Sequence, residues 1–234
     1  MTIDEKRWQK KLARKRKAQA SRKPLAQRSN SHSPAQAALR PVHAALITRE
    51  VFAVGIGMVA LARELPDGDV ATAAFVVDIY CLGVKNAFYR VLPPEEWLRF
   101  VQTQEFEAIQ PSCLRKLVEG AVAYARDLGF PAHADYARAA ALFGTIDAAA
   151  CPLRYTYGND GKPFYVSGPK ETLAQSRRIM DTLTRRLGAD GFHFLAQIDA
   201  PPVATAIEAG QRVALGSGEV GAGQMPAETD VEHR

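Results

Sequence analysis

The chain has 234 residues, 47% of them apolar, which is enough for one folded domain with a hydrophobic core. Its net charge of +5 is uneven: residues 1–40 hold twelve Lys and Arg against two acids and carry +10, while the remainder carries −5. The most apolar run, residues 51–62, is too short to span a bilayer, and the charged first 25 residues lack the apolar core of a secretory signal. We therefore expect no membrane insertion and a cytoplasmic location.

The cysteine content supports the same location. Only three cysteines occur, at positions 81, 113 and 151, and their wide spacing does not form a disulfide framework. A sparse, odd set is typical of a reducing compartment, so we expect free thiols.

The N-terminal segment, residues 1–41, is predicted to be a disordered basic arm and linker. Trp8 and Leu12 are nearly its only apolar side chains before Pro24, so a free helix there would bury nothing. Clustered basic residues attract phosphate backbones without sequence preference, which makes RNA, DNA or a ribosome the expected partner. An arm that only aids solubility is the alternative, and an anionic membrane surface is a lesser one because little can be buried in lipid. The predicted nucleic-acid contacts are Lys6, Arg7, Lys10, Lys11, Arg14, Lys15, Arg16 and Lys17.

The folded domain is expected over residues 42–200. Residues 51–62 and 70–80 are rich in β-formers and flank a strong turn signal at 64–69, which predicts an antiparallel hairpin. The second of these strands is apolar on both faces, so it should lie inside a sheet. Helices are expected to begin at Pro94 and at Pro111, and an alanine-rich helix is expected over residues 134–143.

A second hairpin is predicted around the glycine turn at residues 158–161, because aromatic alternating runs lie on both sides of it. An amphipathic helix should follow over residues 171–187, and residues 191–198 should return as a strand. The side chains of this helix expected to face inward are Leu173, Ile179, Met180, Leu183 and Leu187. The glycine-rich residues 201–234 are expected to be disordered. The predicted fold class is α+β: two antiparallel hairpins form a sheet packed against three or four helices.

One motif imitates a dinucleotide fingerprint. Gly55 and Gly57 are followed by an acid, Asp78, at a suitable distance. A helix after these glycines would end before Pro66, and no β-α-β alternation follows. We therefore favour a strand in which the glycines allow a bulge or a close backbone contact, and we expect no cofactor.

The densest group of reactive side chains is Asp78, Cys81 and Lys85, and these are the candidate catalytic residues. Asp78 ends a buried strand, so its carboxylate needs a partner such as Lys85, Arg63 or a run of backbone amides. In a functional interpretation Asp78 and Lys85 form a catalytic or phosphate-contacting site with Cys81 as nucleophile or ligand. In a structural interpretation Asp78 caps the strand end and Cys81 is a small core residue.

Two other constellations are weaker. Cys81, Cys113, Cys151 and His133 lack the short spacings of a zinc site, so we predict no metal. A Cys81–His133 set with Asp135 or Asp147 is permitted but has no support from spacing. Lys162, Phe164 and Tyr165 interleave basic and aromatic residues, which suits either base stacking or an ordinary half-buried strand.

The strings FVVDIYCLGVKNAFYR and YGNDGKPFYVSGP resemble an uncharacterised family of bacterial proteins in which a VDxYCLGVK string follows a hairpin and a GKPFYxSGP string comes later. The resemblance covers roughly residues 41–198. It implies that Asp78, Cys81, Gly83 and Lys85 act as a unit, and it attaches no activity or cofactor.

Two functions remain open from the sequence. The first is association with nucleic acid or ribosomes through the basic arm. The alternative is an enzyme of unknown reaction with a site around Asp78, Cys81 and Lys85; a scaffold without chemistry is a third, weaker option.

Overall fold

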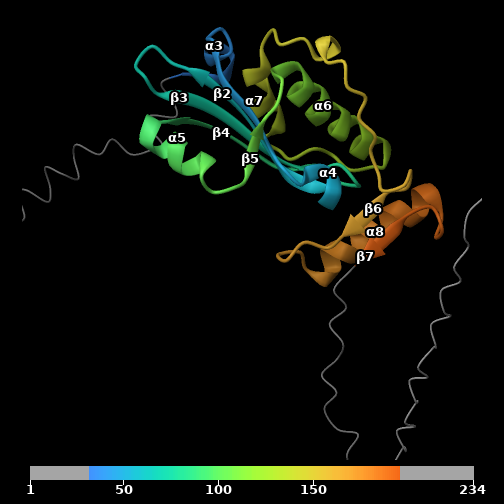
Figure 1. The fold of residues 1–234 in the computed structure, drawn as a ribbon. Coiled ribbons are helices and arrows are strands. Elements are labelled where there is room, and N and C mark those ends of the chain that lie inside the picture. Colours follow the sequence, from blue (N-terminus) through green and yellow to red (C-terminus); the bar gives the residue numbers. More distant parts are fainter. Residues whose placement is uncertain (1–31, 196–234) are drawn as a thin grey trace, which may run out of the picture. The chain divides into compact units, whose positions relative to one another are not determined.

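The computed structural model describes residues 32–195. They form a five-stranded antiparallel sheet with helices on both faces, and a separate two-stranded parallel sheet (Figure 1). The predicted α+β class is confirmed, although the main sheet has five strands and is larger than the predicted sheet of two hairpins. The predicted arm contacts, Lys6 to Lys17, and the predicted tail of residues 201–234 lie outside the described residues.

The main sheet has the strand order β4-β3-β2-β1-β5, with every neighbouring pair antiparallel. Four strands follow one another as a meander, and the short fifth strand adds to the edge beside β1. The strands are β1 (Val42–Thr48), β2 (Ile56–Glu64), β3 (Val70–Asp78), β4 (Gly83–Leu92) and β5 (Phe106–Ala108).

The first predicted hairpin is confirmed as β2 and β3, which pair from Ile56 opposite Asp78 to Glu64 opposite Val70. β3 lies between β2 and β4, which explains why both of its faces are apolar. The expected first strand begins later than predicted, because residues 51–54 form the short helix α4 (Val51–Val54). Gly55 ends α4 at φ 82°, and the Tyr80 ring occupies the space that a side chain there would need.

Helices cover the two faces of the sheet unequally. α6 (Pro111–Asp127) and α7 (Tyr136–Ala140) pack on one face, where the main hydrophobic core lies. The helix predicted to begin at Pro111 is confirmed as α6, and its Leu114, Leu117 and Val118 are fully buried. α5 (Pro94–Val101) places Trp97 against the other face.

The second predicted hairpin is wrong. A turn with one bridge, Asn159 to Lys162, is present, but the residues before it form no strand. Tyr157 instead stacks on Tyr124 of α6 and donates a hydrogen bond to the Leu117 carbonyl (3.1 Å), so this run packs on the helix rather than on its neighbour in sequence. The run after the turn becomes β6 (Phe164–Val166), which pairs in parallel with β7 (His193–Leu195), part of the predicted returning strand.

The last predicted helix is confirmed as α8 (Leu173–Leu187). Thr172 caps its first turn by accepting a hydrogen bond from the Gln175 amide, and Gly188 follows its end. Leu183 is fully buried as expected, but Leu173 and Leu187 are exposed because they lie in the terminal turns beyond the contact with the core.

The expectation of three free thiols is also wrong. Cys113, in the first turn of α6, forms a disulfide with Cys151, which follows the 3₁₀ turn η2 (Ala148–Ala150). The fold brings the two Cα atoms within 4.8 Å although 38 residues separate them, a proximity that spacing alone does not reveal. Cys81 is the free cysteine. The thiol argument for a reducing compartment therefore loses its basis.

Packing extends to the N-terminal side of Val42. The short helix α3 (Pro34–Ala37) buries Ala37 completely, and the Tyr89 hydroxyl donates a hydrogen bond to the His32 carbonyl (2.9 Å). Of the helices in residues 32–195, none combines the length and the hydropathy needed to cross a membrane.

Candidate functional site

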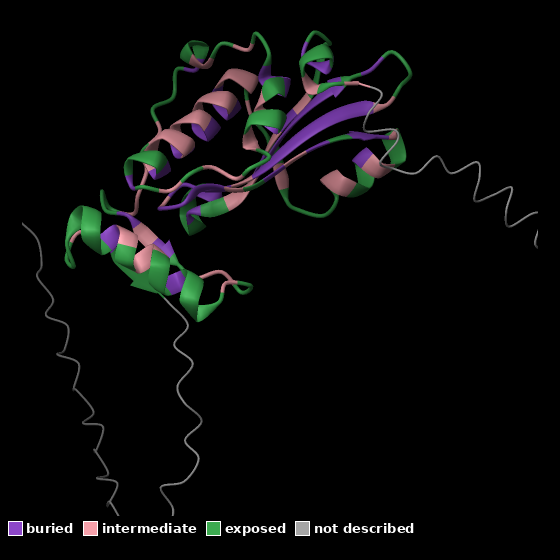
Figure 2. Ribbon diagram, turned by 180° about the vertical axis from the view of Figure 1, so that it is seen from behind, coloured by how far each residue is buried: buried purple, intermediate pink, exposed green. Residues whose placement is uncertain are grey.

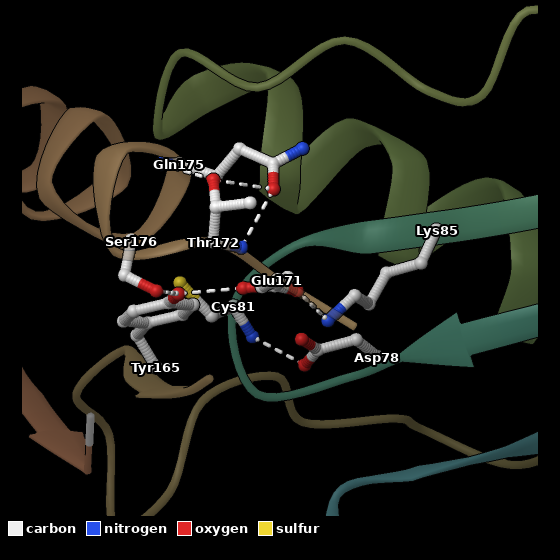
Figure 3. Close-up of polar contacts among 8 residues, drawn as sticks. All are labelled: Asp78, Cys81, Lys85, Tyr165, Glu171, Thr172, Gln175 and Ser176. Carbon is white, nitrogen blue, oxygen red and sulfur yellow. Dashed lines mark hydrogen bonds and ion pairs between the residues drawn. The ribbon is translucent and has the colours of Figure 1, made fainter. Parts of the chain in front are cut away.

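The turn between β3 and β4 holds all three candidate catalytic residues. Asp78 is the last residue of β3, Cys81 lies in the turn, and Lys85 is in the first part of β4. Asp78 is only 5% exposed, and its Oδ1 accepts a hydrogen bond from the Tyr80 amide (3.0 Å). The same oxygen accepts a hydrogen bond from the Cys81 amide (2.9 Å), which Figure 3 shows. Among the partners that the sequence allowed for Asp78, backbone amides are the ones bonded to it.

Burial dominates the electrostatics of Asp78. Loss of solvent raises the pKa of its carboxyl above the ordinary value, although the amide hydrogen bonds and the attraction of Lys85 oppose the rise. Arg63 is not its partner, because that guanidinium donates to the carbonyls of Leu142 (3.0 Å) and Phe143 (2.9 Å). Asp78 is therefore a buried acid whose charge is compensated by amides and by one nearby ammonium.

Cys81 is fully buried in a second core cluster with Leu128, Tyr165 and Leu183. Burial, with a smaller contribution from Asp78, raises the pKa of its thiol to about 12. A nucleophilic cysteine needs a lowered pKa and access to a substrate, and Cys81 has neither. The structural interpretation of Cys81 as a small core residue fits this environment.

Lys85 belongs to a polar network that the sequence analysis missed. Its Nζ lies 2.7 Å from Oε1 of Glu171, whose Oε2 accepts a hydrogen bond from the Tyr165 hydroxyl (2.6 Å). The same hydroxyl lies 2.9 Å from Oγ of Ser176 on α8. Figure 3 shows these side chains converging from β4, β6 and the start of α8. The network ties the small parallel sheet and α8 to the β3–β4 turn.

The ionisation of Glu171 follows from these contacts. Burial alone would raise its pKa, but the hydrogen bonds from Lys85 and Tyr165 outweigh burial and hold the pKa below the ordinary value. Burial raises the pKa of Tyr165 to about 12, and its hydrogen bond to Glu171 adds to the rise. Lys85 and Glu171 therefore form an ion pair at neutral pH, with Tyr165 as a neutral donor.

A cavity of about 160 Å³ lies beside this turn. Asp78, Tyr80, Lys85 and Ser167 supply its polar side chains. The apolar lining comes from α4, β2 and β6, through Val54, Ile56, Phe164 and Val166. Cys81 does not line it. Typical ligand cavities measure roughly 300–1,000 Å³, so this one suits only a small molecule or the end of a larger one.

A cavity of about 410 Å³ adjoins this one: both are lined by Val54 and Ile56, and the larger one is also lined by Arg49, Gln104 and Glu105. None of the candidate catalytic residues lines it. Arg49 is paired with Glu107 at 2.9 Å in an exposed contact. Size alone therefore does not make this cavity the better candidate site.

The two strings that carry the family resemblance lie side by side. The Phe164 amide donates to the Tyr80 carbonyl (3.1 Å), and the Gly158 amide donates to the Ile79 carbonyl (2.9 Å). Gly83 has its own structural reason: it adopts φ 64°, and a Cβ there would lie 2.7 Å from the Ala125 Cβ of α6. The strings thus meet in one region, next to the cavity.

The other sequence candidates do not assemble into a site. His133 Nδ1 lies 3.9 Å from an Asp135 carboxylate oxygen, while Asp147 accepts a hydrogen bond from the Ala149 amide. Two members of the hypothetical zinc set, Cys113 and Cys151, are joined as a disulfide. Within residues 32–195, no group of three or more His, Cys, Asp or Glu side chains is arranged to hold a metal ion.

The base-stacking surface that the sequence allowed for Phe164 and Tyr165 is not formed. Tyr165 is fully buried, and Phe164 is half-buried with its ring 6.4 Å from that of Tyr80. A base cannot stack on a side chain without exposure. Lys162 is exposed and donates to the Asp190 carbonyl (3.2 Å).

Comparison with known proteins adds no relative: the chain matches no family model, no curated protein and no solved structure. Function is therefore argued from charge and geometry alone.

Proposed function

We propose that the protein associates with nucleic acid or ribosomes through its basic N-terminal arm, residues 1–31. The supporting observation is the distribution of charge. Residues 1–31 hold eleven Lys and Arg against two acids, whereas residues 32–195 hold seventeen basic and seventeen acidic residues. The excess positive charge is thus concentrated outside the neutral folded body, in a segment with few apolar side chains.

The basic side chains of residues 1–31 are suited to electrostatic binding of phosphate groups. Each Lys or Arg that neutralises a phosphate releases counterions, so binding weakens steeply as salt rises. Contact by all eight predicted residues, Lys6 to Lys17, gives a slope of log K against log salt of about −7 on duplex DNA. Such binding carries no base preference.

The test compares three proteins by fluorescence anisotropy on a labelled RNA hairpin and a labelled DNA duplex of unrelated sequence. They are the full chain, a chain that begins at His32, and a full-length variant with the eight predicted contacts changed to Gln. We expect tight, salt-dependent binding by the full chain and a large loss in the other two. Equal binding by the full chain and the chain that begins at His32 would contradict the proposal.

A second candidate function rests on the cavity beside Asp78. We infer that it binds a small polar molecule, because a buried carboxyl with a raised pKa and an ammonium both line an otherwise apolar space. In this second candidate function the protein is an enzyme of unknown reaction, and Asp78 and Lys85 are the polar groups of its site. Cys81 has no place in this version.

A thermal-shift screen of small amines, carboxylates and zwitterions tests the second candidate. A true ligand should raise the Tm of the wild-type protein and lose that effect in the Asp78→Asn variant. A matched variant at an exposed position, Asp67→Asn, should keep it. If no compound raises the Tm, or if both variants respond alike, the cavity is structural.

A further inference from the structure

The outward side of α8 is a row of arginines on an otherwise neutral body. α8 buries Leu183 completely and Ile179 and Met180 partly, against the second core cluster. Its opposite side is exposed, as the green outer surface of this helix in Figure 2 shows. That side carries Arg177, Arg178, Arg185 and Arg186.

These four guanidinium groups lack acidic partners among the described residues. Within residues 32–195, the guanidinium groups of Arg177 and Arg178 make no hydrogen bond, ion pair or ring contact. Arg185 donates to the Asp181 carbonyl (3.2 Å) and the Thr182 hydroxyl (3.3 Å), and Arg186 donates to the Asp127 carbonyl (3.1 Å). All of these acceptors are neutral, so the positive charges remain uncompensated.

Charge is locally concentrated on this helix. α8 holds four arginines and one acid, Asp181, whereas residues 32–195 as a whole are neutral. Elsewhere on the body four basic side chains are neutralised by a carboxylate contact, namely Arg49, Lys85, Arg115 and Arg126. α8 therefore presents the body's own site of positive potential.

The spacing suits a phosphate backbone. Arg178 and Arg185 are seven residues apart, which places them on the same side of the helix about 10 Å apart. This distance matches the axial rise of about three nucleotides along one strand. Arg177 and Arg186 flank that line on either side.

A lipid surface fits less well. A helix that lies in a membrane needs an exposed apolar face, and the apolar face of α8 is already buried in the protein. Among the large apolar side chains of α8, Leu173 and Leu187 at its two ends are exposed, and Ile179 and Met180 are partly buried. Electrostatic attraction without apolar insertion favours nucleic acid.

We propose that the arginine face of α8, Arg177, Arg178, Arg185 and Arg186, is a second contact for the phosphodiester backbone of the same nucleic acid that binds the N-terminal arm. This inference rests on the proposed function. Two linked contacts raise the effective concentration of each for the strand, so their affinities reinforce one another. Arginine donates to phosphate in a fork geometry, which orients the body on the strand without reading bases.

The test uses the full chain with all four arginines changed to Gln. The control variant loses the same charge from exposed arginines elsewhere on the body, Arg49, Arg90, Arg99 and Arg154. Each protein is titrated against the labelled RNA hairpin and the DNA duplex over a series of salt concentrations, and against anionic phospholipid vesicles.

We expect the α8 variant to bind at least tenfold more weakly at low salt. Its salt slope on duplex DNA should be shallower by about 3 to 4, near 0.9 for each lost phosphate contact. The control should keep most of the wild-type slope. Weaker binding of the α8 variant to the RNA hairpin or to the DNA duplex supports the proposal. The nucleic acid on which binding weakens identifies the source of the phosphodiester.

Three outcomes overturn the inference. If the α8 variant and the control bind alike while deletion of residues 1–31 removes binding, the arm acts alone and the proposed function stands without this contact. If the wild-type full chain binds neither the RNA hairpin nor the DNA duplex, the proposed function of the N-terminal arm and the proposed contact of α8 both fail. If the α8 variant loses only vesicle binding, the helix is a membrane contact instead.

Discussion

The disulfide between Cys113 and Cys151 fastens the segment that precedes β6 to the first turn of α6. The two cysteines are 38 residues apart, and the entropy of closing a loop of that length corresponds to a stabilisation of about 4 kcal/mol. In a chain of this size each kcal/mol shifts the Tm by roughly 2–4 °C. Changing both cysteines to Ser should therefore lower the Tm by roughly 8–16 °C.

Thermal unfolding followed by circular dichroism measures this effect without reductant. Reduced wild-type protein should unfold at the temperature of the double Ser variant, and the variant itself should not respond to reductant. Thiol titration in denaturant should find one reactive thiol, Cys81, before reduction and three after it. The reasoning would be refuted by three reactive thiols in wild-type protein purified without reductant. It would also be refuted if unreduced wild-type protein and the double Ser variant had equal Tm values.

Three further predictions follow from the site. Lys85→Met leaves the Glu171 carboxylate half-buried with fewer partners, and it should lower the free energy of unfolding by about 1–3 kcal/mol in chemical denaturation. Arg49→Met removes an exposed ion pair and should lower it by less than about 1 kcal/mol. Equal losses of stability would contradict the burial argument. Gly83→Ala should lower the free energy of unfolding by about 1–3 kcal/mol more than Gly68→Ala, because both glycines have positive φ but only Gly83 lies close to α6. The same denaturation experiment measures both variants, and similar losses of stability would be inconsistent with that contact. Because burial raises the pKa of Asp78, the folded state holds a proton that the unfolded chain has released, and the free energy of unfolding falls as pH rises through that range. Asp78→Asn should therefore gain stability relative to wild type as the pH rises above the ordinary range of an aspartate carboxyl, and a difference that does not change with pH would argue against a raised pKa.

Local patterns predicted the elements that local interactions determine. The β2–β3 hairpin follows from a turn signal between two apolar runs, and α6 follows from a proline start and a regular apolar stripe. The need of Asp78 for a partner also followed from its place at the end of a buried strand, and backbone amides two and three residues away supply it. These contacts lie within a few residues of one another in sequence.

Long-range contacts were beyond a single sequence. β6 pairs with β7 rather than with the run before its turn, and Tyr157 of that run instead stacks on Tyr124 of α6. Lys85 pairs with Glu171, 86 residues later, and no spacing rule links them. An acid two residues after the SGP string and just before a helix-capping Thr172 was the available signal for Glu171.

The central claim is that residues 1–31 attach the protein to nucleic acid or ribosomes. The most direct measurement is the ratio of absorbance at 260 to 280 nm, with ribosome co-sedimentation at rising salt, for the full chain and for the chain that begins at His32, both purified from cells. The account predicts that the full chain carries nucleic acid or ribosomes and releases them as salt rises, while the shorter chain carries far less. Equal loads on the two proteins, or no load on the full chain, would contradict it.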